Sequence, residues 1–160
     1  MMMQTLRRLQ RPTQQRMRMS DAEQKPDLSA RGMAPVLREA HFPDRAPVDA
    51  YGNNGFRFAG MSHKGGIQCL PSGIYGWNVE TAEDITDAEA FERCFGEEGE
   101  LELLFVGTGI DLVPLKPDVK AAFKEAGIWV EVMSTGAAIR TFNVLLAEGR
   151  KVGAALLPVA

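Results

Sequence analysis

The sequence predicts a single α/β domain in which a largely parallel core sheet is extended or covered by an antiparallel meander. Three observations support this class. The chain has 160 residues, a length typical of one domain. Apolar and polar residues alternate with a period of two between Val48 and Val79, as they do in half-buried strands. Beyond Leu101, short apolar segments alternate with helical patterns, which indicates right-handed strand–helix–strand crossovers.

The alternating segments of the first half are separated by turn residues. Glycine, asparagine, proline and serine cluster in "YGNNGF", "SHKGG" and "PSGI". Short strands joined by such turns predict an antiparallel meander. The strands are expected around residues 56–58, 67–69 and 75–79.

Each element of the second half carries its own signal. Thr86 and Glu89 have the spacing of a capping box, which predicts a short helix that ends at Gly96. Pro117 opens a longer helix whose apolar residues recur at i, i+3, i+4 and i+7, and Gly127 ends it. Buried strands are expected at residues 101–107 and 128–133 and in "KVGAALLPV", with a helix between Ser134 and Arg150.

Residues 1–46 are expected to form a mostly flexible tail, and residues 47–160 a single α/β domain. The first segment has no sustained apolar period, so it cannot offset its ordering entropy. Its first 20 residues carry five arginines and no acid. They admit three interpretations: a mitochondrial targeting segment, a disordered basic arm, or an upstream extension before a later start at Met17 or Met19. We expect a cytoplasmic bacterial protein, or a mitochondrial one if residues 1–20 are a targeting segment.

The composition excludes several functional classes. Beyond residue 20 the chain has 13 basic and 21 acidic side chains, a net charge of −8, whereas nucleic-acid binding needs a basic face. No apolar run approaches the ~18 residues that span a bilayer. Cys69 and Cys94 are expected to be reduced thiols and are too few for a structural zinc site. We therefore expect no metal, no cofactor, no nucleic-acid partner and no transmembrane segment.

Two turns are candidates for a small anion-binding cleft. "GTGID" follows one buried strand, and Ser134–Gly136 leads from another strand into a helix. Because parallel strands end at the same sheet edge, both turns are expected there. Capping of the helix by Ser134 or Thr135 is the simpler interpretation of the second turn, although the same N–H groups can bind an anion. The candidate cleft residues are Lys64, Gly107, Thr108, Gly109, Asp111, Thr135 and Gly136.

No catalytic motif is found. The glycine run at Gly107 lacks the third glycine of a dinucleotide fingerprint, and no Gly-x-Ser-x-Gly elbow occurs. His41 and His63 lack the spacing of a metal pair one helical turn apart. Lys64 and Asp111 could meet at the cleft as a base and acid, but an exposed surface charge is the simpler interpretation of each. We assign no catalytic residue and do not expect an enzyme.

The C-terminal helix presents a second candidate surface. Ala138, Phe142, Leu145 and Leu146 cluster on one side at 100° per residue. Arg140 and Asn143 lie roughly opposite this stripe, within about 60° of each other. They are therefore candidates for binding a partner protein, although a solvated face or contact with a neighbouring loop gives the same pattern.

Three segments resemble a known family. They are "NGFRFAGMSHKGGIQCLPSGIYGW", "FVGTG" and "GIWVEVMSTGAAIRTFNVLLAEGRKVGAALLPV", in this order. Together they are similar to the small α/β family that includes the mitochondrial respiratory complex I assembly factor and the adipogenesis-associated protein with the same domain. The resemblance covers about residues 45–158. It implies a single three-layer domain with a mixed central sheet, no established enzyme activity, and, for the mitochondrial branch, help in assembling NADH:ubiquinone oxidoreductase.

The resemblance also has two departures. The family motif often has an aspartate before the threonine, where this chain has Ser134, and often a cysteine before the arginine, where it has Ile139. The absence of an acid and a thiol weakens any family-wide catalysis at these places. The matching positions are Gly60, Lys64, Gly65, Pro71, Trp77, Gly107, Thr108, Gly109, Thr135, Ala138, Arg140, Thr141, Asn143, Leu145, Glu148 and Arg150.

Two functional hypotheses follow. The first is a non-enzymatic interaction or assembly protein resembling respiratory complex I assembly factors, with a protein partner among complex I subunits or assembly intermediates. The alternative is a small-anion or metabolite-binding protein, or an enzyme, with a cleft at Gly107–Asp111 and Ser134–Gly136.

Overall fold

The computed structural model describes residues 41–97 and 99–160. Of the flexible tail expected at residues 1–46, residues 1–40 lie outside the described residues. The part of the tail that is described belongs to the fold. His41 N–H donates to the Ile74 carbonyl (2.8 Å), Phe42 forms a bridge with Ile74, and Ala46 is buried. The folded region therefore begins earlier than the predicted start near Pro47.

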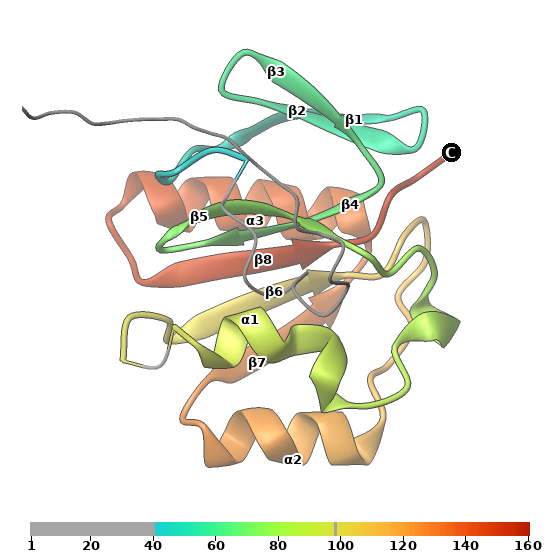
Figure 1. The fold of residues 1–160 in the computed structure, drawn as a ribbon, viewed down its shortest axis with the longest axis vertical. Helices are drawn as coiled ribbons and strands as arrows, with labels where there is room; N and C mark the ends of the chain where they lie inside the picture. The colour runs from blue at the N-terminus through green and yellow to red at the C-terminus, as the bar shows by residue number, and fades with distance from the viewer. Residues whose placement is uncertain (1–40, 98) are drawn as a thin grey trace, which may run out of the picture. The chain divides into compact units, whose positions relative to one another are not determined.

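Two sheets build the domain (Figure 1). The first has three antiparallel strands in the order β1-β2-β3: β1 (Val48–Gly52), β2 (Gly55–Phe58) and β3 (Met61–Lys64). The second has five strands in the order β5-β4-β8-β6-β7. Its strands are β4 (Gly66–Leu70), β5 (Gly73–Trp77), β6 (Leu103–Gly107), β7 (Trp129–Met133) and β8 (Val152–Leu156).

The five-stranded sheet is mixed. Strand β6 is parallel to both β7 and β8, as the two crossovers predict. Strand β4 is antiparallel to β5 and to β8. The predicted meander is therefore divided: β4 and β5 extend the core sheet, while β1, β2 and β3 form a separate sheet. The predicted α/β class with a mixed central sheet and an antiparallel N-terminal part is confirmed.

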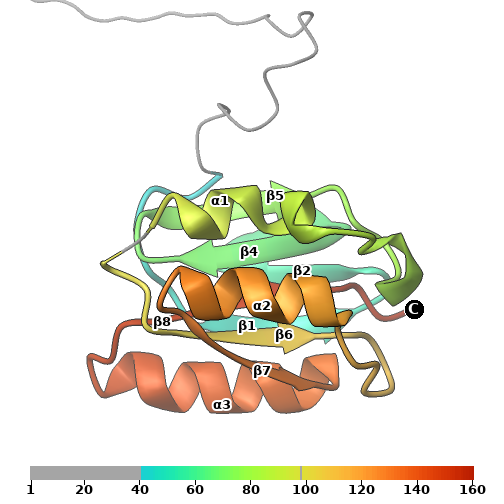
Figure 2. The ribbon, with the colours of Figure 1, turned by 90° about the horizontal axis from the view of Figure 1, so that it is seen from below.

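The helices cover the two faces of the five-stranded sheet, and in Figure 2 strands of this sheet lie between α1 and α3. Helix α3 (Thr135–Ala147) and the three-stranded sheet share one hydrophobic cluster, which includes Phe56, Phe105 and Phe142. The opposite cluster contains buried side chains from α1 (Glu92–Phe95) and α2 (Pro117–Glu125), including Cys94 and Phe123. The result is the three-layer arrangement.

The predicted capping box at Thr86 and Glu89 is wrong. The capping box lies earlier, at Thr81 and Asp84, and it starts the 3-10 turn η4 (Ala82–Asp84). The next element, the 3-10 turn η5 (Ala88–Phe91), begins after Asp87, whose carboxylate accepts the Glu89 N–H (2.9 Å). Aspartate and threonine are both favourable N-cap residues. Asp87, which directly follows Thr86, therefore takes the N-cap position that the sequence predicted for Thr86. Helix α1 then ends at Gly96, as expected.

The two cysteines lie on opposite faces of the central sheet. Cys69 belongs to the cluster beneath α3, and Cys94 belongs to the cluster around α1 and α2. Both thiols are free and buried, as the prediction of reduced thiols requires. Burial raises the pKa of Cys69 to about 12. Burial, and secondarily the charge of Glu97, raise the pKa of Cys94 as well. Because the thiolate is the reactive form, neither thiol is suited to nucleophilic chemistry.

Candidate functional site

The two candidate turns lie side by side at the carboxyl edge of the sheet. Strands β6 and β7 are parallel neighbours, and the turns that follow them are joined by backbone hydrogen bonds. Thr108 N–H donates to the Met133 carbonyl (3.0 Å), and Thr135 N–H donates to the Gly109 carbonyl (2.8 Å). The shared edge predicted from the sequence is thus confirmed, but the turns bond to each other across it.

Both threonine hydroxyls of the candidate cleft are engaged by protein groups. The buried Thr135 Oγ1 donates to the Leu157 carbonyl (2.8 Å) and accepts the Gly109 N–H (2.9 Å). Thr108 Oγ1 donates to the Asp111 carbonyl (2.7 Å) and accepts the Val113 N–H (2.9 Å). Thr135 Oγ1 therefore connects the two turns, Thr108 Oγ1 stabilises its own loop, and the single donor of each hydroxyl is already used.

The start of α3 is capped from within the protein. Ser134 is the N-cap, and its hydroxyl accepts the Ala137 N–H (3.4 Å), which is the capping interpretation of this turn. The Tyr51 hydroxyl occupies the position where a side chain on Gly136 would lie. Gly107 also has no room for a side chain, because a Cβ there would be 2.8 Å from Thr135 Cα. These glycines allow close packing between elements.

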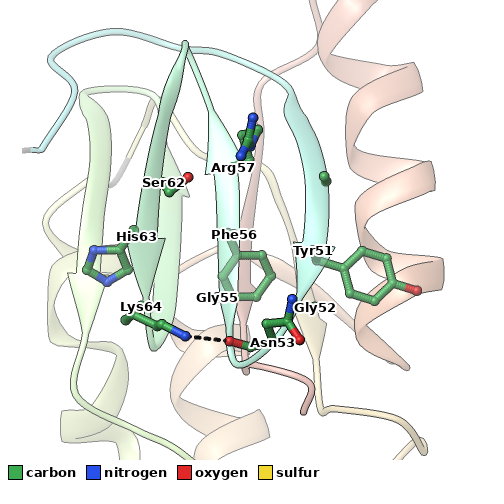
Figure 3. A pocket seen from close by; sticks show the side chains of 10 residues that line it. Tyr51, Gly52, Asn53, Gly55, Phe56, Arg57, Ser62, His63 and Lys64 are labelled. Carbon is green, nitrogen blue, oxygen red and sulfur yellow. Dashed lines mark hydrogen bonds between the residues drawn. The ribbon is translucent and has the colours of Figure 1, made fainter.

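Lys64 and Asp111 lie on different elements. Lys64 ends β3, and its Nζ donates to the Asn53 carbonyl (2.9 Å; Figure 3). Asp111 is an exposed residue of the loop that follows β6. The hydrogen bonds made by the described residues do not join them, so the acid–base pairing stays a prediction without geometric support.

A cavity of about 380 Å³ is formed by the three-stranded sheet (Figure 3). Its charged side chains are Arg57 and Lys64, and it includes Tyr51, Ser62 and His63 but no carboxylate. Arg57 pairs with Ser62 across β2 and β3, and Lys64 follows Ser62 by two residues, so all three side chains project from the same face. The cavity is therefore a basic site on a domain of negative net charge.

Arg140 and Asn143 have different environments. Arg140 is exposed, and its Nη1 lies 3.6 Å from the Cβ position of Gly136, beside the Tyr51 hydroxyl. Asn143 is half-buried and bonds β1: its Oδ1 accepts the Val48 N–H (3.0 Å) and its Nδ2 donates to the Val48 carbonyl (2.9 Å). Asn143 therefore connects α3 to the three-stranded sheet, and its partner-binding role stays a prediction.

We define the basic face as Tyr51 and Arg140, which meet at the start of α3. Arg57 and Lys64 do not belong to it, because Tyr51 pairs with Phe56 and its side chain therefore projects from the side of the sheet opposite to theirs. Tyr51 is 44% exposed. Sequence reasoning identified Lys64 and Arg140 but missed Tyr51 and Arg57, which gave no signal beyond their places in an alternating strand pattern.

Sequence reasoning also missed the meeting of His41 and His63. Their ring centroids are 4.8 Å apart and their planes are inclined by 40°. Burial lowers the pKa of His63 from its ordinary value, and the neighbouring His41 lowers it further, while a hydrogen bond with the Gly66 backbone acts in the opposite direction. The structure thus favours the neutral imidazole at position 63.

This lowered pKa predicts a pH-dependent stability. The unfolded chain binds the His63 proton more tightly than the folded one, so the stabilisation is complete above the unfolded pKa near 6.5 and is lost as the pH falls through it. In chelator-treated buffer, the melting temperature should fall less steeply for His63→Gln than for the natural chain between about pH 7.5 and 5.5. If the melting temperatures of the two proteins fell equally with pH over this range, the lowered pKa of His63 would be contradicted.

Two further properties concern only the residues that the structure describes. None of their helices is long and apolar enough to cross a membrane. They also contain no group of three or more histidine, cysteine, aspartate or glutamate side chains placed to hold a metal ion.

Comparisons with known proteins identify relatives across the folded region. The chain is 39% identical over 122 residues to NADH dehydrogenase (ubiquinone) 1 alpha subcomplex assembly factor 3 of Mus musculus, covering 76% of this chain and 65% of that protein. The chain thus spans about two thirds of the length of this relative. It is 38% identical over 127 residues to an uncharacterised protein of Rhodobacter capsulatus, covering 79% of this chain and 94% of that protein.

Solved structures show the same fold. A crystal structure from Bartonella henselae, described as an outer membrane protein, is 50% identical with a TM-score of 0.69, covering 75% of this chain and all of that chain. The family model described as "Protein of unknown function (DUF498/DUF598)" matches residues 48–157. The resemblance to the assembly-factor family drawn from three sequence segments is confirmed. The chain belongs to the DUF498/DUF598 family.

Proposed function

We propose that the chain is a non-enzymatic assembly protein that binds subunits or assembly intermediates of respiratory NADH:ubiquinone oxidoreductase. One observation carries the proposal: the similarity to the mouse assembly factor extends over 122 residues and therefore over nearly the whole folded domain. Because the chain spans 65% of that relative, the shared domain is the part to which we assign the binding role.

The environments of two threonine and two cysteine side chains support a role in binding rather than catalysis. Thr108 and Thr135 use their hydroxyl protons in bonds to backbone carbonyls. Cys69 and Cys94 are buried thiols with raised pKa values. These side chains therefore lack the activated state that a nucleophile needs.

The basic face is the surface that we assign to the partner. Tyrosine and arginine are enriched among residues that dominate protein interfaces, because both combine a large planar contact area with hydrogen-bond donors. Tyr51 and Arg140 meet at the start of α3, where Arg140 supplies an exposed positive charge. A partner surface with carboxylates would complement this charge.

Arg140→Glu tests this surface. Since Arg140 is exposed, the substitution should change the free energy of unfolding by no more than about 0.5 kcal/mol. It should nevertheless reduce the co-purification of respiratory subunits, measured by affinity purification from the native cell and mass spectrometry. Lys120→Glu is the matched control, because Lys120 is an exposed cation on α2, which packs with the other hydrophobic cluster.

Each outcome of the purification has a distinct meaning. Loss of respiratory subunits with Arg140→Glu but not with Lys120→Glu supports both the function and the surface. If equal amounts of respiratory subunits co-purify with both variants, the basic face is not the partner-binding surface. A stoichiometric small molecule in place of respiratory proteins would favour the alternative of a metabolite-binding protein.

A further inference from the structure

The chain has only two histidines, His41 and His63. In the folded domain their rings are in contact. His41 lies just before the bridge to β5, and His63 lies on β3. The contact brings their ring centroids to 4.8 Å. Because the two rings come from separate segments of the chain, their contact depends on the tertiary structure.

Gly76 on β5 shows how the two rings are directed. A Cβ at this position would lie 3.0 Å from Nε2 of His41 and 3.5 Å from Nε2 of His63. The Nε2 atoms of both rings therefore lie near the same small region beside the glycine. Any side chain at position 76 would occupy that region.

The backbone holds both histidines in this arrangement. His41 N–H donates to the Ile74 carbonyl (2.8 Å), two residues before Gly76 on the same strand. His63 is fixed by the pairing of β3 with β2, opposite Phe56. A hydrogen bond with the Gly66 backbone also engages the His63 imidazole. Such an outer bond orients a ligating imidazole.

We propose that His41 and His63 form a two-histidine binding site for a borderline divalent transition metal ion of the Zn²⁺, Ni²⁺ and Cu²⁺ class. Neutral imidazole nitrogen is a preferred ligand of these ions. Zinc–nitrogen bonds are about 2.0–2.1 Å long, so an ion beside Gly76 would draw the two Nε2 atoms together. Rotation of the exposed His41 side chain supplies this adjustment.

Two protein ligands leave the remaining coordination positions to water. The site is open on the His41 side, because this histidine is exposed while His63 is half-buried. A bound ion would connect the segment that enters the domain at His41 to strand β3. Binding to the folded chain alone would then raise the melting temperature by mass action.

The test is a titration of the full chain with Zn²⁺, followed by the imidazole NMR signals and by calorimetry. With only two histidines, every imidazole signal belongs to the proposed site. One Zn²⁺ per chain should shift both imidazole spin systems together. Movement of a single ring, or no movement at millimolar Zn²⁺, would overturn the proposal.

Two variants separate coordination from folding. His41→Phe keeps an aromatic ring beside His63 but removes the coordinating nitrogen. Gly76→Ala keeps both histidines but fills the region near their Nε2 atoms. Each should weaken Zn²⁺ binding at least about 10–100-fold, the loss that changes in outer-shell groups alone commonly cause.

The same two variants, His41→Phe and Gly76→Ala, also give the results that would contradict the proposal. Unchanged Zn²⁺ affinity in folded His41→Phe would show that the ion binds through other groups. If Gly76→Ala does not fold, His41→Phe alone decides the result. Ni²⁺, which also prefers imidazole, should give the same stoichiometry, whereas Mg²⁺, which prefers oxygen ligands, should leave both rings unchanged.

Discussion

Phe142→Ala is expected to lower the free energy of unfolding by about 3–5 kcal/mol. Phe142 is 2% exposed and lies in the cluster that joins α3 to the central sheet and to the three-stranded sheet. Its removal deletes buried apolar area and leaves a cavity among three elements, which backbone pairing prevents from collapsing. Urea unfolding followed by circular dichroism measures the loss.

Val144→Ala is the matched control on the same helix. Val144 is 57% exposed, so its truncation should change stability by about 0.5 kcal/mol or less. If Phe142→Ala also lowered the free energy of unfolding by less than about 1 kcal/mol, the described packing of Phe142 between α3 and the two sheets would be contradicted.

Thr135→Val is expected to lower the free energy of unfolding by about 2–4 kcal/mol. Valine has nearly the same shape as threonine, so packing is preserved while the hydroxyl is lost. The Leu157 carbonyl and the Gly109 N–H then lose the partner that Thr135 Oγ1 supplies. Thr135 is fully buried, so water cannot replace the hydroxyl without rearrangement.

Thr141→Val is the control for the loss of a hydroxyl. Thr141 Oγ1 donates to the Ala137 carbonyl (3.0 Å) within α3, at a half-buried position. A carbonyl inside a helix already accepts a backbone N–H, so this loss should cost about 0.5–1 kcal/mol. Equal costs for both variants would contradict the role of Thr135 in joining the two turns.

Most of the fold could be predicted because its signals are local. Period-two alternation identified the early strands, and Pro117 and Gly127 marked the limits of α2. The division of the meander into two sheets could not be predicted in the same way. Strands β3 and β4 are separated only by Gly65, which has a positive φ of 89°, and a turn of this kind does not reveal whether pairing continues across it.

The candidate site was harder to predict because its contacts are distant in sequence. The bonds between Asn143 and Val48 join residues 95 positions apart, and helical periodicity alone placed Asn143 on an open face. The pair of His41 and His63 depends on the docking of the entering segment against β5. The two turns at the sheet edge were located correctly, since parallel strands impose that edge.

The function is tested most directly by the amount of assembled NADH:ubiquinone oxidoreductase in cells that lack the gene. Native gel electrophoresis with an NADH dehydrogenase activity stain measures the complex. The proposed assembly role predicts that deletion lowers the assembled complex, that the natural gene restores it, and that Arg140→Glu restores it less than Lys120→Glu. An unchanged amount of assembled, active complex in the deletion strain would contradict the assembly role.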